Sequence, residues 1–117
     1  MGLAIGDALG APLEFQKANE PDAYLTEYAT GGPHNVSIGE WTDDTSMALA
    51  MATSLIEKKS FDADDIMKKF CEWYQQGKFW TRDICFDIGN TVYNALSSYS
   101  DSIKQNQFPQ VYIQNRR

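Results

Sequence analysis

The residue types best suited to chemistry in this sequence are the adjacent carboxylates of Thr42-Asp43-Asp44-Thr45, which precede an apolar run. At a helix N-terminus each acid gains about 0.3–1 kcal/mol from the helix dipole, so capping explains one of the two aspartates. It explains the pair less well, because carboxylates about 4 Å apart repel by roughly 4 kcal/mol at an effective dielectric near 20. Asp43 and Asp44 therefore either share a cation or point outward into water.

Any cation at this pair would be a hard one. Aspartate and threonine oxygens with no histidine or cysteine beside them are typical ligands of magnesium, manganese or calcium. Thr42 can add a hydroxyl ligand, and Asp7 and Glu14 in the N-terminal segment are further oxygen donors. A metal with several acids and open water positions suits the activation of water and the orientation of an anionic or polyhydroxyl substrate.

Other catalytic systems find little support in the sequence. A serine or cysteine nucleophile would have to use His34, the single histidine, and neither Cys71 nor Cys85 lies beside a basic activator. His34 falls in a polar loop and is interpreted as a surface or capping residue, although a loop histidine could reach a ligand. The two cysteines are expected to be half-buried free thiols, and no phosphate-binding GK[ST] motif is present.

Composition sets the class of protein. A chain of 117 residues with 43% hydrophobic and 13% aromatic residues predicts one globular domain with a modest core. The formal charge is −6 and the basic residues form no cluster, so binding to a nucleic-acid backbone is not expected. The apolar N-terminal run is too short for a membrane span and lacks the positive region of a signal peptide, so we expect no membrane contact and a cytoplasmic protein.

The elements that must position these residues are helices. Residues 1–10 carry glycines at every fourth position, Gly2, Gly6 and Gly10, which would share one helix face. Such a face serves either a close helix contact or the approach of a backbone to a ligand. A polar stretch over residues 16–40, broken by glycines and prolines, is expected to be a long loop.

Three further helices are predicted after the loop. The first starts at Thr42 or Asp43 and has an apolar repeat that includes Met47, Met51 and Leu55. The second is capped by Asp62 and ends at Gly77, and the third runs from about residue 82 to residue 100 with Gly89 inside its pattern. No strand alternation persists, so the expected class is all-α, followed by a polar tail over residues 101–117.

Three stretches carry a resemblance to a known family. GLAIGDALGAPLEF at 2–15, GEWTDDTSMALAMATSL at 39–55 and CFDIGNTVYNAL at 85–96 resemble, in order and spacing, the N-terminal motifs of the ADP-ribosylglycohydrolase family. The resemblance implies an orthogonal all-α helical bundle, of which residues 1–100 would be the N-terminal part. It also implies two magnesium ions, or manganese, and hydrolysis of the N- or O-glycosidic bond of an ADP-ribosylated substrate.

The same resemblance assigns roles to individual residues. It implies metal ligation by Thr42, Asp43 and Asp44, and catalysis by Glu14 and Asp44. Substrate binding would involve Asp7, Glu14, Asp87 and Gly89. The expected partners are ADP-ribose and ADP-ribosylated proteins or small molecules.

The chain departs from the family pattern most clearly in its metal-binding motifs. The family carries a late Asp-x-Asp-Thr motif that completes the dinuclear site, and nothing after Asp87 resembles it. We therefore expect a truncated form with little or no hydrolase activity alone, and self-association through apolar surface left uncovered. The alternative is a catalytically dead module that binds ADP-ribose or a partner protein.

Overall fold

The computed structural model describes residues 1–17 and 24–104, and this part of the chain is helical. It contains helices α1 (Gly2–Gly10), α2 (Asp43–Lys58), α3 (Ala63–Gln76) and α4 (Asn90–Lys104), with a short 3-10 turn, η1 (Ala11–Leu13), directly after α1. The described residues form no strand beyond one isolated bridge between Gly31 and Val36. The predicted all-α class is therefore confirmed. No helix in the described ranges has the length and apolar content needed to cross a membrane.

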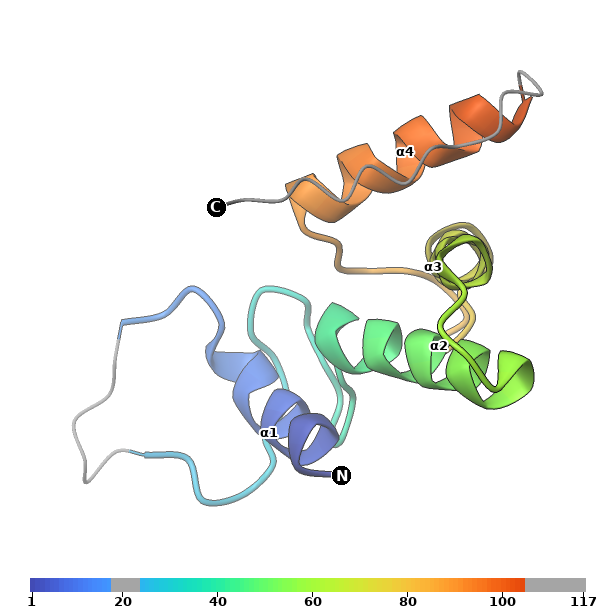
Figure 1. The fold of residues 1–117 in the computed structure, drawn as a ribbon. Helices are drawn as coiled ribbons and strands as arrows, with labels where there is room; N and C mark the ends of the chain where they lie inside the picture. The colour runs from blue at the N-terminus through green and yellow to red at the C-terminus, as the bar shows by residue number, and fades with distance from the viewer. Residues whose placement is uncertain (18–23, 105–117) are drawn as a thin grey trace, which may run out of the picture.

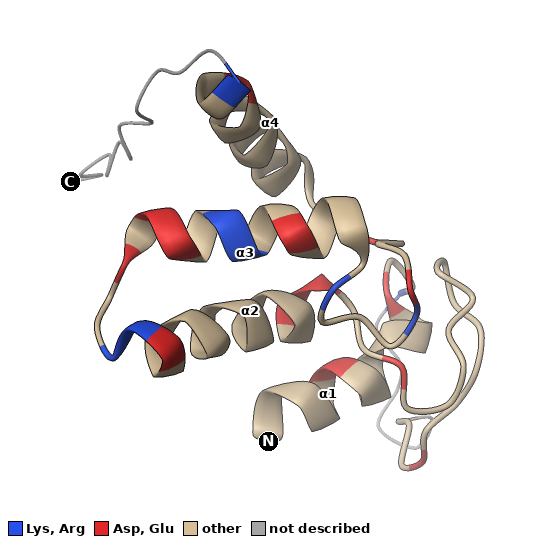
Figure 2. Ribbon diagram, turned by 90° about the vertical axis from the view of Figure 1, so that its right-hand side faces the viewer, with Lys and Arg blue, Asp and Glu red and all other residues tan. Residues whose placement is uncertain are grey.

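The helices follow one another in space as they do along the chain. Figure 2 shows α2 between α1 and α3, with α4 on the far side of α3. In Figure 1, α3 is seen nearly end-on while α2 and α4 run across the view, so neighbouring helices cross rather than run parallel. The N-terminus of α2 thus lies beside α1, where residues distant in sequence can meet.

Helix α2 buries small residues rather than the apolar repeat that the sequence suggested. Ser46, Ala50 and Ser54 recur at four-residue spacing and are fully buried, whereas Met51 and Leu55 keep 39% and 37% of their surface exposed. The apolar repeat of Met47, Met51 and Leu55 correctly predicted the helix, but its last two members do not lie on the buried face. Small side chains let α3 pack closely against α2, and the Ser54 hydroxyl donates to the Asp65 carboxylate of α3 at 2.6 Å.

The core lies among α3, α4 and the segment that connects them. Its buried centre consists of Trp73, Trp80 and Leu96, and the indole rings of the two tryptophans are 5.6 Å apart. Half-buried side chains pack around this centre, among them Met47 from α2 and Phe86 from the connecting segment. Because Phe86 is anchored here, its neighbour Asp87 is held in place as well.

Helix α3 begins and ends where the sequence predicts. The Asp62 side chain caps it by accepting from the Asp65 backbone N–H at 3.0 Å, and Gly77 ends it with a left-handed φ of 70°. A Cβ atom at Gly77 would lie 2.2 Å from the Asp83 carbonyl oxygen, so this turn requires glycine. The tight turn sends the chain back toward the N-terminus of α2.

Helix α4 starts later than predicted. The expectation of a helix from about residue 82 was wrong, because residues 82–89 form an irregular segment and α4 begins at Asn90. The Gly89 carbonyl accepts from the Tyr93 N–H at 2.9 Å, so this glycine precedes the helix instead of interrupting it. Helix α4 continues to Lys104, and residues 105–117 of the expected tail lie outside the described residues.

Candidate metal and catalytic site

Asp7 of α1 caps the N-terminus of α2, although the two lie far apart in the sequence. Its two carboxylate oxygens accept from the Thr42 backbone N–H at 3.1 and 3.0 Å and from the Thr42 hydroxyl at 2.7 Å. They also accept from the Thr45 N–H at 3.2 Å and the Thr45 hydroxyl at 2.6 Å. Thr42 occupies the N-cap position as predicted, but its own side chain makes no capping bond. A carboxylate from another helix thus performs the function of a capping side chain.

These contacts define what Asp7 does in the described structure. Both of its oxygens already accept hydrogen bonds, and both threonines that donate to them are buried. Asp7 therefore fastens α1 to the start of α2 and fixes the two residues on either side of Asp43-Asp44. The predicted contact of Asp7 with substrate stays a prediction.

A pocket of about 320 Å³ opens beside this junction. Four carboxylates line it, together with threonine, glycine and apolar residues: Asp7, Glu14, Asp43, Asp44, Thr42, Gly6, Gly10, Ala11 and Leu13. A Cβ atom added at Gly6 or Gly10 would meet no other atom within 4 Å. Among the described residues the glycine face of α1 therefore serves no close helix contact, and it leaves the wall of the pocket open.

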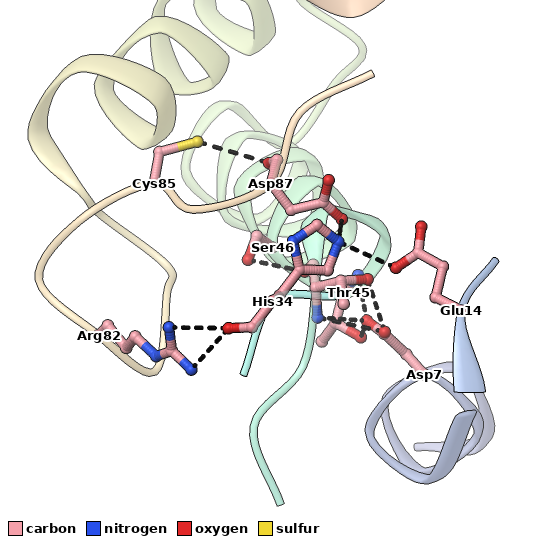
Figure 3. A network of polar contacts seen from close by, with 9 residues as sticks. Asp7, Glu14, His34, Thr45, Ser46, Arg82, Cys85 and Asp87 are labelled. Atoms are coloured by element: carbon pink, nitrogen blue, oxygen red, sulfur yellow. Dashed lines mark hydrogen bonds and ion pairs between the residues drawn. The ribbon is translucent and has the colours of Figure 1, made fainter. Parts of the chain in front are cut away.

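His34 links Glu14, which lines this pocket, to one further carboxylate, that of Asp87. Its Nε2 lies 3.1 Å from a Glu14 oxygen and 3.4 Å from an Asp87 oxygen, and Figure 3 shows the ring between these two side chains. The His34 side chain is only 15% exposed. Sequence reasoning favoured a surface or capping histidine, and the structure places it instead between two of the predicted substrate-binding residues.

The loop that carries His34 is fixed at both ends. Backbone bonds of 2.8 and 2.9 Å join Gly31 and Val36, so His34 lies in a tight turn. A Cβ atom at Gly32 would lie 2.6 Å from the Pro12 carbonyl oxygen, so only glycine lets this turn approach η1, which leads to Glu14. The sequence signal for this arrangement was the Gly31-Gly32-Pro33 breaker directly before the histidine.

Arg82 closes the loop from the other side. Its guanidinium donates to the His34 carbonyl at 3.3 Å and to the Asn35 carbonyl at 2.8 Å, and it pairs with the Glu40 carboxylate at 2.5 Å. The Arg82 guanidinium holds the pKa of Glu40 below its usual range. The same guanidinium stacks over the Phe86 ring, so it ties the loop to the segment that carries Asp87.

The electrostatics of the site favour the binding of a cation. Burial, together with the negative charges of Asp43 and Glu14 and against the opposing effect of His34, raises the pKa of Asp87 to about 6. Burial also raises the pKa of Asp44, with added contributions from Asp43 and Asp7. Carboxylates that resist ionisation because of one another are stabilised when a cation binds among them.

The donor atoms fit a divalent cation. Glu14, His34 and Asp87 each offer one ligand atom, and these atoms lie within 4.8 Å of one another. Asp43 and Asp44 face the same pocket as Glu14. Oxygen donors in this number suit magnesium or manganese, and an imidazole close by is more compatible with manganese. The structure thus brings together Glu14 with both aspartates of the α2 N-terminus, while Gly89 is exposed and makes no described contact with the pocket.

Crossed helices around an acidic pocket at a helix N-terminus define an α-helical protein whose site is suited to a divalent cation. A family model described as ADP-ribosylglycohydrolase matches residues 1–113. The chain therefore belongs to the ADP-ribosylglycohydrolase family.

Curated relatives of the chain carry matching names. It is 44% identical over 99 residues to the ADP-ribosylarginine hydrolase Tri1 of Serratia proteamaculans and 40% identical over 99 residues to that of Pseudomonas putida. Each match covers 85% of this chain and 26% of the relative. An ADP-ribosyl-dinitrogen reductase glycohydrolase of Rhodospirillum rubrum is 35% identical over 102 residues, which cover 85% of this chain and 32% of that protein. The chain thus spans about a quarter to a third of the length of these relatives.

Proposed function

We propose that this chain supplies the N-terminal side of an ADP-ribosylglycohydrolase active site that cleaves the glycosidic bond between ADP-ribose and arginine. The observation that carries the proposal is the convergence of Glu14, Asp43, Asp44 and Asp87 around the α2 N-terminus. Family membership gives the reaction class. Two relatives at 44% and 40% identity that are named ADP-ribosylarginine hydrolases support arginine as the acceptor.

In this proposal Thr42, Asp43 and Asp44 hold magnesium or manganese. When bound, such an ion supplies polarisation of a water molecule and of substrate oxygens, and it offsets the repulsion between the carboxylates and an anionic substrate. The Thr42 hydroxyl donates its proton to Asp7, which leaves its oxygen lone pairs free to face a cation. Asp7 keeps the N-terminus of α2 in place while the ion is exchanged.

The remaining carboxyl groups manage protons and orientation. Glu14 lines the pocket and accepts from His34, and in this proposal its carboxylate is the base that would deprotonate a nucleophilic water. Asp44 is the second proposed catalytic carboxylate. Asp87, with a pKa raised to about 6 in the described chain, can hold or release a proton near neutral pH.

A chimaera tests the proposed function. The segment of the Serratia relative that matches this chain would be replaced by the matching 99 residues of this chain, and release of ADP-ribose from ADP-ribosylarginine would be measured with magnesium or manganese. We expect turnover by the chimaera and its loss in Asp43→Asn and Asp44→Asn variants. Asp64→Asn, which removes a carboxylate on α3 outside the pocket, serves as the control. A folded chimaera without activity, or one unaffected by Asp43→Asn, would refute the proposal.

The 117-residue chain alone is expected to release little or no ADP-ribose, because one cluster of carboxylates holds magnesium weakly. The alternative of a binding module draws on exposed apolar side chains: Leu3, Ile56 and Phe61 each keep more than half of their surface exposed. Size-exclusion chromatography tests the predicted self-association, and binding of ADP-ribose without metal would favour the module.

A further inference from the structure

We propose that His34 is a positioning residue of this site, whose Nε2–H holds the Glu14 and Asp87 carboxylates together at the rim of the pocket. The inference rests on the proposed function, in which Glu14 is a catalytic carboxylate. Glu14 follows η1 and Asp87 precedes α4, so the two carboxylates come from segments that share no secondary structure. His34 reaches both, at 3.1 and 3.4 Å.

The imidazole is held in place before any ion arrives. Its ring centroid lies 5.9 Å from that of Phe86, which itself packs against the buried Trp80. Its backbone carbonyl accepts from Arg82 at 3.3 Å, and the turn around it is closed by the Gly31–Val36 bonds. Because the backbone of the turn and the imidazole ring are both held, His34 can set the position of the Glu14 carboxylate that it contacts.

A donor is what two neighbouring carboxylates require. Glu14 and Asp87 repel each other, and each can rotate toward solvent unless a positive or N–H group lies between them. His34 Nε2 occupies that place and contacts both. Loss of the donor would let Glu14 rotate away from Asp43 and Asp44, and the pocket would lose one carboxylate from its cation-binding geometry.

Two substitutions separate a donor from a metal ligand. In His34→Gln the amide Nε2 reproduces the position of the ring Nε2–H, but an amide nitrogen, whose lone pair is delocalised, is a poor metal ligand. In His34→Phe the ring packing on Phe86 is kept and the donor is lost. Tyr99→Phe is the matched control, because it removes a buried hydrogen bond to Asp64 at the α3–α4 contact, away from the pocket.

The measurement is calorimetric titration of the 117-residue chain and its variants with Mn²⁺ alone. Loss of a residue that orients metal ligands typically costs 10–100-fold in affinity, so His34→Phe should weaken Mn²⁺ binding by at least about tenfold. His34→Gln and Tyr99→Phe should bind like the wild type. Equal affinity in all variants would overturn the proposal, and so would His34→Gln binding as weakly as His34→Phe, which would make the ring a ligand itself.

A second measurement keeps the inference separable from the proposed function. If the wild-type chain binds no Mn²⁺, the metal part of the proposed function fails, and ¹⁵N spectra of the single histidine in metal-free buffer still test the positioning role. The proposal expects Nε2 to carry a proton and its signal to shift in Glu14→Gln and Asp87→Asn. A neutral ring protonated only at Nδ1, unchanged in both variants, would overturn it.

Discussion

Replacement of Asp7 by alanine should destabilise the chain far more than loss of an ordinary helix cap. Asp7 accepts the Thr45 N–H, a capping bond whose removal typically costs about 1 kcal/mol. It also accepts the hydroxyl protons of Thr42 and Thr45, two residues that are 5% and 3% exposed. A buried donor left without a partner costs about 1–3 kcal/mol, so the loss of the cap and of both hydroxyl acceptors should lower the free energy of unfolding by at least about 3 kcal/mol.

Urea denaturation of matched variants measures this difference. Asp62→Ala removes the cap of α3, where the side chain accepts from the Asp65 N–H, and should cost about 1 kcal/mol. A Thr45→Val change in the Asp7→Ala background should cost less than the same change in the wild-type chain, because the hydroxyl no longer has its acceptor. If Asp7→Ala costs no more than Asp62→Ala, or the two changes are additive, the inter-helix cap does not exist as described.

Three more predictions concern the half-buried carboxyl group of Asp87 and the loop that carries His34. Asp87→Asn should stabilise the metal-free chain: the folded-state pKa of about 6 lies above the ordinary 3.8, so the charged group costs up to about 3 kcal/mol above pH 6 and nothing below pH 3.8. Thermal melts at pH 8 and pH 3.5 check this, and an equal effect at both would contradict it. Gly32→Ala should lower both the free energy of unfolding and the Mn²⁺ affinity, because the added Cβ would collide with the Pro12 carbonyl oxygen. A urea melt and a calorimetric titration measure the two effects, and the absence of either would contradict the prediction. Arg82→Gln should speed hydrogen exchange at the Val36 amide while leaving amides of α3 unchanged.

The helical elements were largely predictable because their signals are local. Asp62 and Gly77 mark the ends of α3 through side-chain capping and a left-handed turn, and both are read directly from residue type. The start of α4 was not, since Ile84 and Ile88 continue a helical apolar pattern while belonging to an irregular segment. The turn at Gly77 brings that segment back over α3, and there the packing of Phe86 into the core outweighs the helical pattern of the segment's apolar residues.

The site was only partly predictable from sequence. Asp43 and Asp44 were indicated by their adjacency, and Glu14 by the resemblance of its motif. His34 was missed as a member because its partners Glu14 and Asp87 are far from it in sequence, and only the folded loop brings them within 3.4 Å. The capping role of Asp7 was missed for the same reason, because a cap that comes from a different helix leaves no spacing pattern in the sequence.

The most direct test of the central claim is a calorimetric titration of the chain with ADP-ribose, in the presence and in the absence of Mn²⁺. We predict that ADP-ribose binds only with the metal present, and that the double variant Asp43→Asn with Asp44→Asn binds neither Mn²⁺ nor ADP-ribose. Binding of ADP-ribose without metal, or Mn²⁺ binding that survives the loss of both aspartates, would contradict it.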